Sequence, residues 1–125
     1  MNWSAAAAIL LFLAVALGAF GAHGLRNRLD PYSMGVYEKA VFYQFVHALG
    51  LLAVSIMAKM GLLSQTAGAW VCALLVAGIV IFSGSLYALA LTGMRILGAV
   101  TPLGGLSFLA AWLLLAVALL RRQAP

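Results

Sequence analysis

The sequence predicts an all-α integral membrane protein, a four-helix antiparallel bundle with short loops. Of its 125 residues, 66% are hydrophobic and only 7% are charged, whereas a soluble domain has about 25% charged residues. The apolar residues gather into four stretches, each near or above the roughly 20 residues that cross a bilayer core. A soluble chain of this length would need a mostly polar surface. We therefore expect lipid around a single domain, residues 1–125.

The first predicted helix covers residues 3–24. Its apolar run continues to Leu25 and is long enough to span the membrane. A secretory signal peptide begins with basic residues, and residues 1–4 contain none. We therefore expect this segment to be a retained membrane helix.

The second predicted helix covers residues 31–58 and has the clearest start signal. Asp30 can cap the first free N–H groups, and Pro31 suits the first helical position, where no N–H is needed. Its first two turns, which include Glu38 and Lys39, are expected at the membrane interface.

The third and fourth predicted helices cover residues 67–91 and 97–120. Pro102 removes a backbone donor near the start of the last helix, so we expect a kink there. In hydrocarbon, backbone groups must be paired within their own segment, which requires every span to be helical. The connections are short, so neighbouring helices run antiparallel.

The net charge of +5 comes from residues at or near the ends of the apolar segments. This placement suits lipid headgroups, and it lacks the basic stripe of a nucleic-acid-binding surface. We therefore expect membrane lipids as partners and no nucleic acid. Three cationic residues fall on the face of the termini and four on the other face: Lys59, Arg121 and Arg122 against Arg26, Arg28, Lys39 and Arg95. By the positive-inside rule this count favours, by one charge, both termini outside the cytoplasm.

Polar side chains concentrate in one half of the membrane when the four segments are folded antiparallel. Gln44 and His47 lie about two to three turns into the second helix, on the side of the first and third loops, while the other half holds Ser55 and little else polar. Clustered intramembrane polar groups are candidates for function. The predicted ligand-binding residues are His23, Tyr43, Gln44, His47, Ser83, Ser85, Tyr87 and Thr101. We expect a hydrated or ligand-sized concavity there, with Arg26 and Arg95 contacting headgroups.

The same residues also have a structural interpretation. Gln44 and His47 share a helix face and are equally typical of hydrogen bonds between neighbouring helices. A histidine at a helix end, such as His23, is typical of a cap or a headgroup contact. Ser83 and Ser85 are typical of packing residues whose hydroxyls bond to the preceding turn.

Three classes of function follow. The first is a non-enzymatic protein that binds a lipid, a small ligand or a partner helix, including a second copy of the chain. This function requires the fewest specific residues. The alternative is a small transporter or channel that relays protons through histidine. A lipid- or quinone-directed enzyme would use His47 as base and Ser83 or Ser85 as nucleophile, but no deep acid can orient the imidazole. We therefore assign no catalytic residue, no metal site and no cofactor, because two histidines alone do not complete a ligand set.

Four motifs occur in order along the chain: GAFGAHGL at 18–25, YQFVHALGLL at 43–52, FSGSLYALALTG at 82–93 and TPLGGLSFLAAW at 101–112. They resemble the YgdD-like family of small bacterial inner-membrane proteins, whose eukaryotic relatives are called transmembrane protein 256. The resemblance implies a four-helix protein of the bacterial inner (plasma) membrane. It supplies no reaction, substrate or cofactor.

Overall fold

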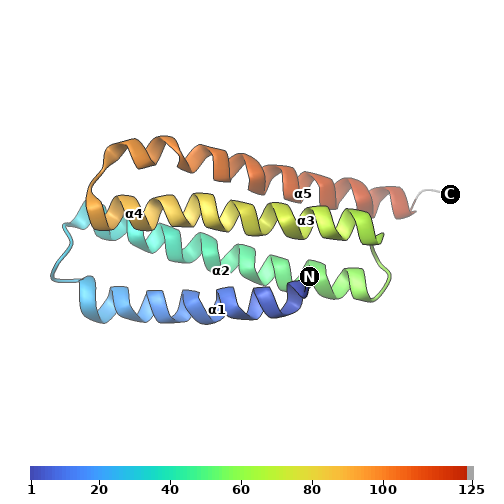
Figure 1. Cartoon of the computed structure of the whole chain (residues 1–125), viewed down its shortest axis with the longest axis horizontal. Coiled ribbons are helices and arrows are strands. Elements are labelled where there is room, and N and C mark those ends of the chain that lie inside the picture. The colour runs from blue at the N-terminus through green and yellow to red at the C-terminus, as the bar shows by residue number, and fades with distance from the viewer. Residues whose placement is uncertain (124–125) are drawn as a thin grey trace.

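The computed structural model describes residues 1–123, and within that range it is all-helical (Figure 1). Four continuous helical spans are long and apolar enough to cross a membrane: Trp3–Leu25, Pro31–Lys59, Gln65–Thr92 and Arg95–Gln123. The predicted four-helix class is confirmed. The spans are built from α1 (Trp3–Phe20), η1 (Gly21–Leu25), α2 (Pro31–Lys59), α3 (Gln65–Gly78), η2 (Ile79–Ser83), α4 (Gly84–Thr92), η3 (Arg95–Ala99) and α5 (Thr101–Gln123).

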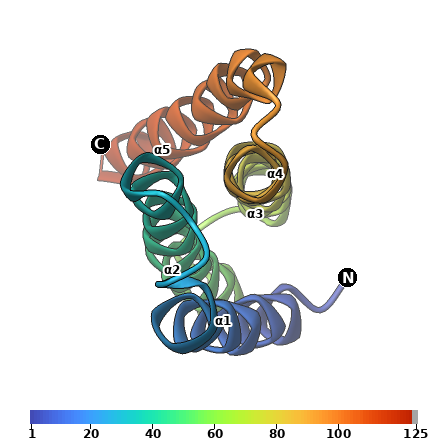
Figure 2. The same ribbon diagram turned by 90° about the vertical axis from the view of Figure 1, so that its left-hand side faces the viewer.

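The bundle is antiparallel and open. The N-terminus, the connection between α2 and α3 and the end of α5 lie at one end, and the first and third loops lie at the other (Figure 1). Seen end-on, α1 and α5 lie on opposite sides of a central pair formed by α2 and the α3–α4 span (Figure 2). Within an apolar 18-residue window of each span, a larger share of residues is buried in the two central spans, 39% and 44%, than in the outer ones, 17% each. The outer helices therefore expose most of their surface to lipid.

Glycines bring the third and fourth spans close together. A Cβ added at Gly104 would lie 2.4 Å from the backbone nitrogen of Phe82, so α5 rests directly on the backbone of η2. The ring of Phe108 occupies the space that a side chain at Gly78 would fill. Such close approach supplies packing where lipid removes the hydrophobic drive for helix association.

The helix starts follow capping chemistry. The Asp30 carboxylate accepts a hydrogen bond from the Ser33 N–H at 2.8 Å, and Pro31 is the first residue of α2, as predicted. Ser64 caps α3 in the same way, accepting from the Ala67 N–H at 3.1 Å. This cap explains why the third helix begins at Gln65, whereas the hydrophobic run alone placed its start at residue 67.

The spans contain irregular turns that sequence periodicity does not reveal. η1 and η2 are π-helical turns, in which the wider winding disturbs the regular hydrogen bonding. The Tyr37 hydroxyl donates to the Leu17 carbonyl just before η1. We expected a kink at Pro102. The structure instead has the 3-10 turn η3 just before α5, and Pro102 lies in the first turn of α5. There the missing N–H breaks no helical hydrogen bond.

Candidate functional site

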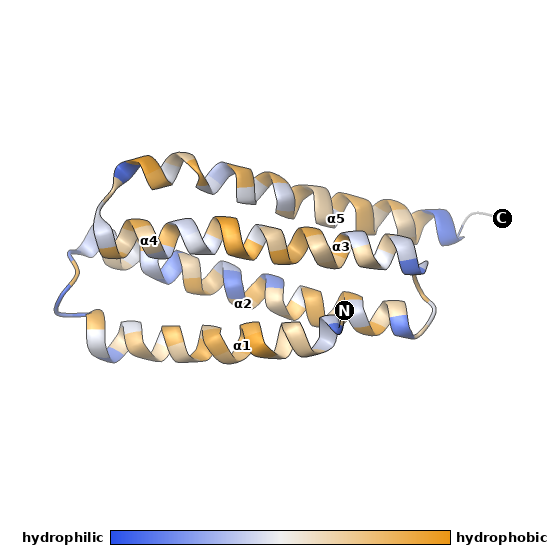
Figure 3. Ribbon diagram, viewed as in Figure 1, coloured by the Kyte–Doolittle hydropathy of each residue, from blue (hydrophilic) through white to orange (hydrophobic). Residues whose placement is uncertain are grey.

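Gln44 joins three helices near the middle of the bundle. Its side-chain nitrogen donates to the Leu10 carbonyl of α1 at 2.9 Å, and its side-chain oxygen accepts from the Tyr87 hydroxyl of α4 at 2.6 Å. Figure 3 shows the hydrophilic residues of α2 inside an otherwise apolar band. The amide of this buried residue is thus bonded on both sides within the chain.

The predicted serines and Thr101 also bond within the chain. Ser83 is buried and donates to the Ala40 carbonyl of α2 at 2.8 Å. Ser85 donates to the Phe82 carbonyl of the preceding turn, and its oxygen lies 2.6 Å from the Thr101 hydroxyl. These contacts connect the third span to the second and the fourth.

His47 is held by stacking and by its own helix. Its Nδ1 lies 2.8 Å from the Tyr43 carbonyl, and because a carbonyl only accepts, Nδ1 carries the proton. The imidazole stacks on the Phe108 ring of α5, with centroids 3.5 Å apart, and lies parallel to the Tyr43 ring at 5.8 Å. The histidine therefore forms part of an aromatic layer between α2 and α5.

Seven of the eight predicted ligand-binding residues make contacts between or within helices of the bundle, but as separate groups: Gln44 with Tyr87, Tyr43 with His47, Ser85 with Thr101, and Ser83 with the Ala40 carbonyl. His23 is exposed in η1, and the predicted headgroup residues Arg26 and Arg95 are also exposed. Within residues 1–123, no buried side-chain nitrogen or oxygen lacks a hydrogen-bond partner. This pattern agrees with the structural interpretation of the cluster, and ligand binding by the eight residues stays a prediction. The same part of the chain contains no group of three or more His, Cys, Asp or Glu placed to hold a metal ion.

A groove of about 320 Å³ lies between the first two spans, in the half of the bundle where the polar cluster was predicted. We call it the α1–α2 groove. Arg26 and Glu38, both exposed, contribute a cation and an anion to its lining. The Tyr37 ring and the side chains of Phe42 and Phe45 supply apolar wall. Of the predicted site residues, only Arg26 lines this groove.

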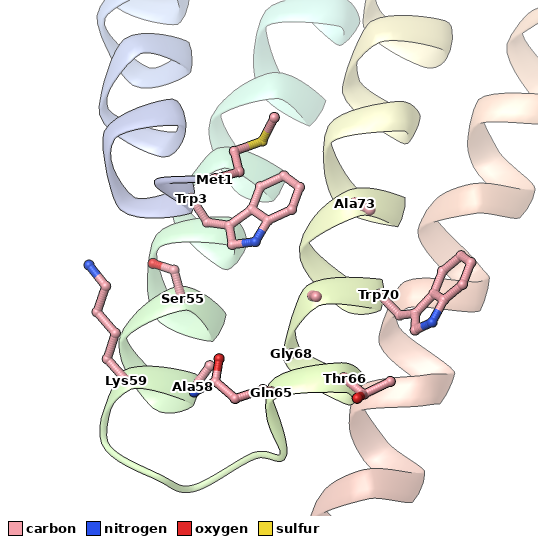
Figure 4. Close-up of a pocket in the computed structure, with 11 residues that line it drawn as sticks. Met1, Trp3, Ser55, Ala58, Lys59, Gln65, Thr66, Gly68, Trp70 and Ala73 are labelled. Atoms are coloured by element: carbon pink, nitrogen blue, oxygen red, sulfur yellow. The ribbon is translucent and has the colours of Figure 1, made fainter.

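A larger groove, of about 750 Å³, lies at the opposite end of the bundle, between α1 and α3 (Figure 4). We call it the α1–α3 groove. The Ser4 and Ser55 hydroxyls lie 2.9 Å apart, and the Lys59 ammonium donates to the Ser4 hydroxyl at 2.9 Å. The sequence expectation named Ser55 as nearly the only polar residue of segments 5–17, 51–57, 71–80 and 109–120, and its partners Ser4 and Lys59 lie just outside those segments. Ser55 and Lys59 are four residues apart and share a helix face, which is the signal that sequence reasoning missed.

A third groove, of about 480 Å³, lies between the second loop and the end of α5 and includes Arg121 and Arg122. None of the eight predicted ligand-binding residues lines any of the three grooves. The sequence predicted the depth of the polar residues in the membrane, but it did not predict where grooves lie between the helices.

Comparison with known proteins identifies the relatives of the chain. A family model described as "Protein of unknown function (DUF423)" matches residues 17–105. A UPF0382 membrane protein of Staphylococcus saprophyticus is 50% identical over 110 residues, which cover 88% of this chain and 89% of the relative. The UPF0382 membrane protein YwdK of Bacillus subtilis is 48% identical and covers 89% of each chain. No solved structure matches.

Proposed function

The chain belongs to the DUF423 family of multi-pass membrane proteins, and we propose that it is a non-enzymatic protein of the bacterial inner membrane. Its proposed ligand is a zwitterionic phospholipid, which binds in the α1–α2 groove. The observation that carries the proposal is that Arg26 and Glu38 line the same groove. The sequence-based likeness to the YgdD-like family supports the location and offers no competing substrate.

The charges of the groove suit a phosphate linked to a primary ammonium, as in phosphatidylethanolamine. A guanidinium binds a phosphate through parallel N–H groups, and a carboxylate accepts hydrogen bonds from an ammonium. The cation comes from Arg26, which directly follows η1, and the anion comes from Glu38 on α2, in the turns expected at the membrane interface. Phosphatidylcholine has the same phosphate but no N–H to offer the carboxylate.

The apolar part of the groove suits an acyl chain. Phe42 and Phe45 continue from Glu38 along α2, deeper into the bilayer. Gly18 and Ala22 form the facing wall on the first span, where small side chains leave room. A lipid bound here would place its headgroup at the interface and its chain between the two helices.

A role in binding without catalysis is supported by the hydrogen bonds of the interior serine hydroxyls. Ser83 bonds to the Ala40 carbonyl, and Ser85 bonds to the Phe82 carbonyl and Thr101. Neither candidate nucleophile is hydrogen-bonded to His47. In this proposal the polar cluster holds together the helices that form the groove.

Native mass spectrometry of the detergent-solubilised protein tests the proposal. Phosphatidylethanolamine, phosphatidylglycerol and phosphatidylcholine of matched chain length are added in turn. We expect preferential retention of phosphatidylethanolamine, reduced about fivefold by Arg26→Gln, as for the loss of one cation at a membrane surface. Glu38→Gln should remove the preference over phosphatidylcholine.

Two charge-matched variants serve as controls. Arg28→Gln and Lys39→Gln remove exposed cations that flank the groove without lining it. Both should retain the lipid as the unaltered protein does. Equal retention of the three lipids, or equal effects of Arg26→Gln and Arg28→Gln, would refute the proposal.

A further inference from the structure

The third groove lies where the second loop, residues 60–64, passes beside the end of α5, and we call it the loop–α5 groove. Its volume is about 480 Å³. α5 packs mainly on α3 and continues past the start of that helix (Figure 1), so its last turns lie beside the loop. The loop–α5 groove shares no residue with the α1–α2 groove and lies at the opposite end of the bundle.

Two consecutive arginines line the polar end of this groove. Arg121 and Arg122 are the basic residues in the last turn of α5, which Figure 3 shows as its hydrophilic end. The Arg122 guanidinium donates to the Gly61 carbonyl and so reaches across to the loop. This bond uses one of five N–H donors. Consecutive residues of an α-helix point about 100° apart, so each guanidinium is suited to an anion of its own.

The carboxylate side chains of the protein are too distant to pair with these arginines. The chain has two acidic residues, Asp30 and Glu38, and both lie at the end of the bundle that holds the first and third loops. Lys59 is also at the end of the loop–α5 groove, but it is directed toward α1, where it donates to Ser4 (Figure 4). The groove therefore contains two positively charged side chains and favours an occupant with two negative charges.

The loop side of the groove offers a further donor. Ser64 lines the groove, and its hydroxyl oxygen accepts from the Ala67 N–H at 3.1 Å. In this bond the hydroxyl acts as an acceptor, so its own proton can be donated to a phosphate oxygen.

The rest of the groove is apolar and extends into the bilayer. Leu114, Val117 and Ala118 are half-buried and continue along α5 from Arg121, with Leu62 contributed by the loop. Leu114 lies two helical turns from Arg121, about 10 Å deeper. An acyl chain can lie along this wall, whereas a soluble anion would leave it uncovered. The occupant thus needs both phosphate groups and hydrocarbon.

We propose that the loop–α5 groove binds a phospholipid with two phosphates, of the cardiolipin type, with one phosphate at each guanidinium and one acyl chain along Leu114 and Val117. A lipid with a single phosphate, such as phosphatidylglycerol, engages only one of the two guanidinium groups. This site does not rest on the proposed function. The two lipids differ in charge, leaflet and binding residues, so either proposal can fail alone.

Native mass spectrometry of the detergent-solubilised protein tests this site by titration with cardiolipin or phosphatidylglycerol that carry the same acyl chains. We expect half-maximal binding of cardiolipin at about fivefold lower concentration, as for one additional cation near a membrane surface. Arg26→Gln, which alters the α1–α2 groove, should leave this preference unchanged. The deacylated cardiolipin headgroup, which has both phosphates and no hydrocarbon, should not displace the lipid at equal concentration.

A pair of charge variants locates the preference in the groove. Arg121→Gln should make cardiolipin and phosphatidylglycerol bind equally, because one guanidinium remains for either lipid. Arg121 is chosen because Arg122 also holds the loop. Lys59→Gln removes a cation from the same end but not from the groove, so the preference should remain.

A pair of size variants tests the apolar wall. Val117→Phe narrows the groove and should weaken the binding of both lipids. Leu120→Phe alters an exposed position of α5 outside the groove and should have no effect. Circular dichroism verifies that each variant is folded.

Four outcomes would overturn the proposal. The first is equal binding of the two lipids by the unaltered protein. The second is a preference that survives Arg121→Gln. The third is equal loss of preference in Arg121→Gln and Lys59→Gln, which would assign the effect to diffuse surface charge. The fourth is displacement of cardiolipin by its deacylated headgroup at equal concentration, which would show an anion site that does not use the apolar wall.

Discussion

The Tyr87 hydroxyl donates a hydrogen bond to the side-chain oxygen of Gln44 at 2.6 Å, joining α4 to α2 in the interior of the bundle. The same Gln44 amide donates to the Leu10 carbonyl of α1 at 2.9 Å. One side chain therefore connects three of the four spans. Such a connection restrains the positions of the three spans relative to one another.

A double-mutant cycle measures this connection. Gln44→Leu and Tyr87→Phe each remove one partner, and each should lower the free energy of unfolding by about 1–2 kcal/mol, with a coupling energy of about 0.6 kcal/mol or more. Reversible unfolding in mixed micelles gives both quantities. Tyr32→Phe, which alters an exposed tyrosine of α2, should have no effect. Strictly additive effects of the two substitutions would show that the hydrogen bond does not stabilise the fold.

Gly104 and Gly105 provide a matched pair in the contact between α5 and η2. A Cβ at Gly104 would overlap the Phe82 backbone, whereas a Cβ at Gly105 would lie 3.9 Å from the Phe82 ring, an ordinary contact. Gly104→Ala should therefore cost about 1–3 kcal/mol of unfolding free energy. Gly105→Ala should be neutral or slightly stabilising, because alanine favours the helix. Equal effects in the same micelle assay would contradict this account of the helix contact.

The start of α2 should respond to acid. Hydrogen bonds from the Ser33 N–H and hydroxyl hold the pKa of the Asp30 carboxyl below its ordinary value of 3.8. Because the folded pKa is lower than the unfolded one, the contribution of this cap to stability is complete above pH 3.8. It is lost as the pH falls through the lower, folded value.

Hydrogen exchange in the first turn of α2, corrected for intrinsic rates, checks this expectation. Protection should decrease only below pH 3.8 in the unaltered protein. Asp30→Asn preserves a capping side chain that does not titrate in this range, so its protection should not change with pH. The same acid dependence in both proteins would assign the effect to another group.

For the polar residues, the sequence predicted the depth of each side chain in the membrane, but it did not predict which partner each side chain contacts. Counting residues along each span placed Gln44, Ser85 and Thr101 in one half of the membrane, and the structure joins them to neighbouring helices. Counting could not pair Ser4 with Ser55 and Lys59, which are about 50 residues apart in sequence. Counting placed His23 at the end of the first helix, and the structure shows this histidine exposed in η1.

The sequence by itself determined the four membrane spans, their antiparallel order and the cap at Asp30, because hydropathy and capping depend on residues close together in the chain. The tertiary structure decided how each helix is rotated and which pairs are in contact, and hence where the α1–α2 and α1–α3 grooves lie. The physical reason is that lipid tails are as apolar as leucine. A membrane helix is apolar on both its lipid-facing and its packed sides, so its sequence does not mark which side meets a neighbour.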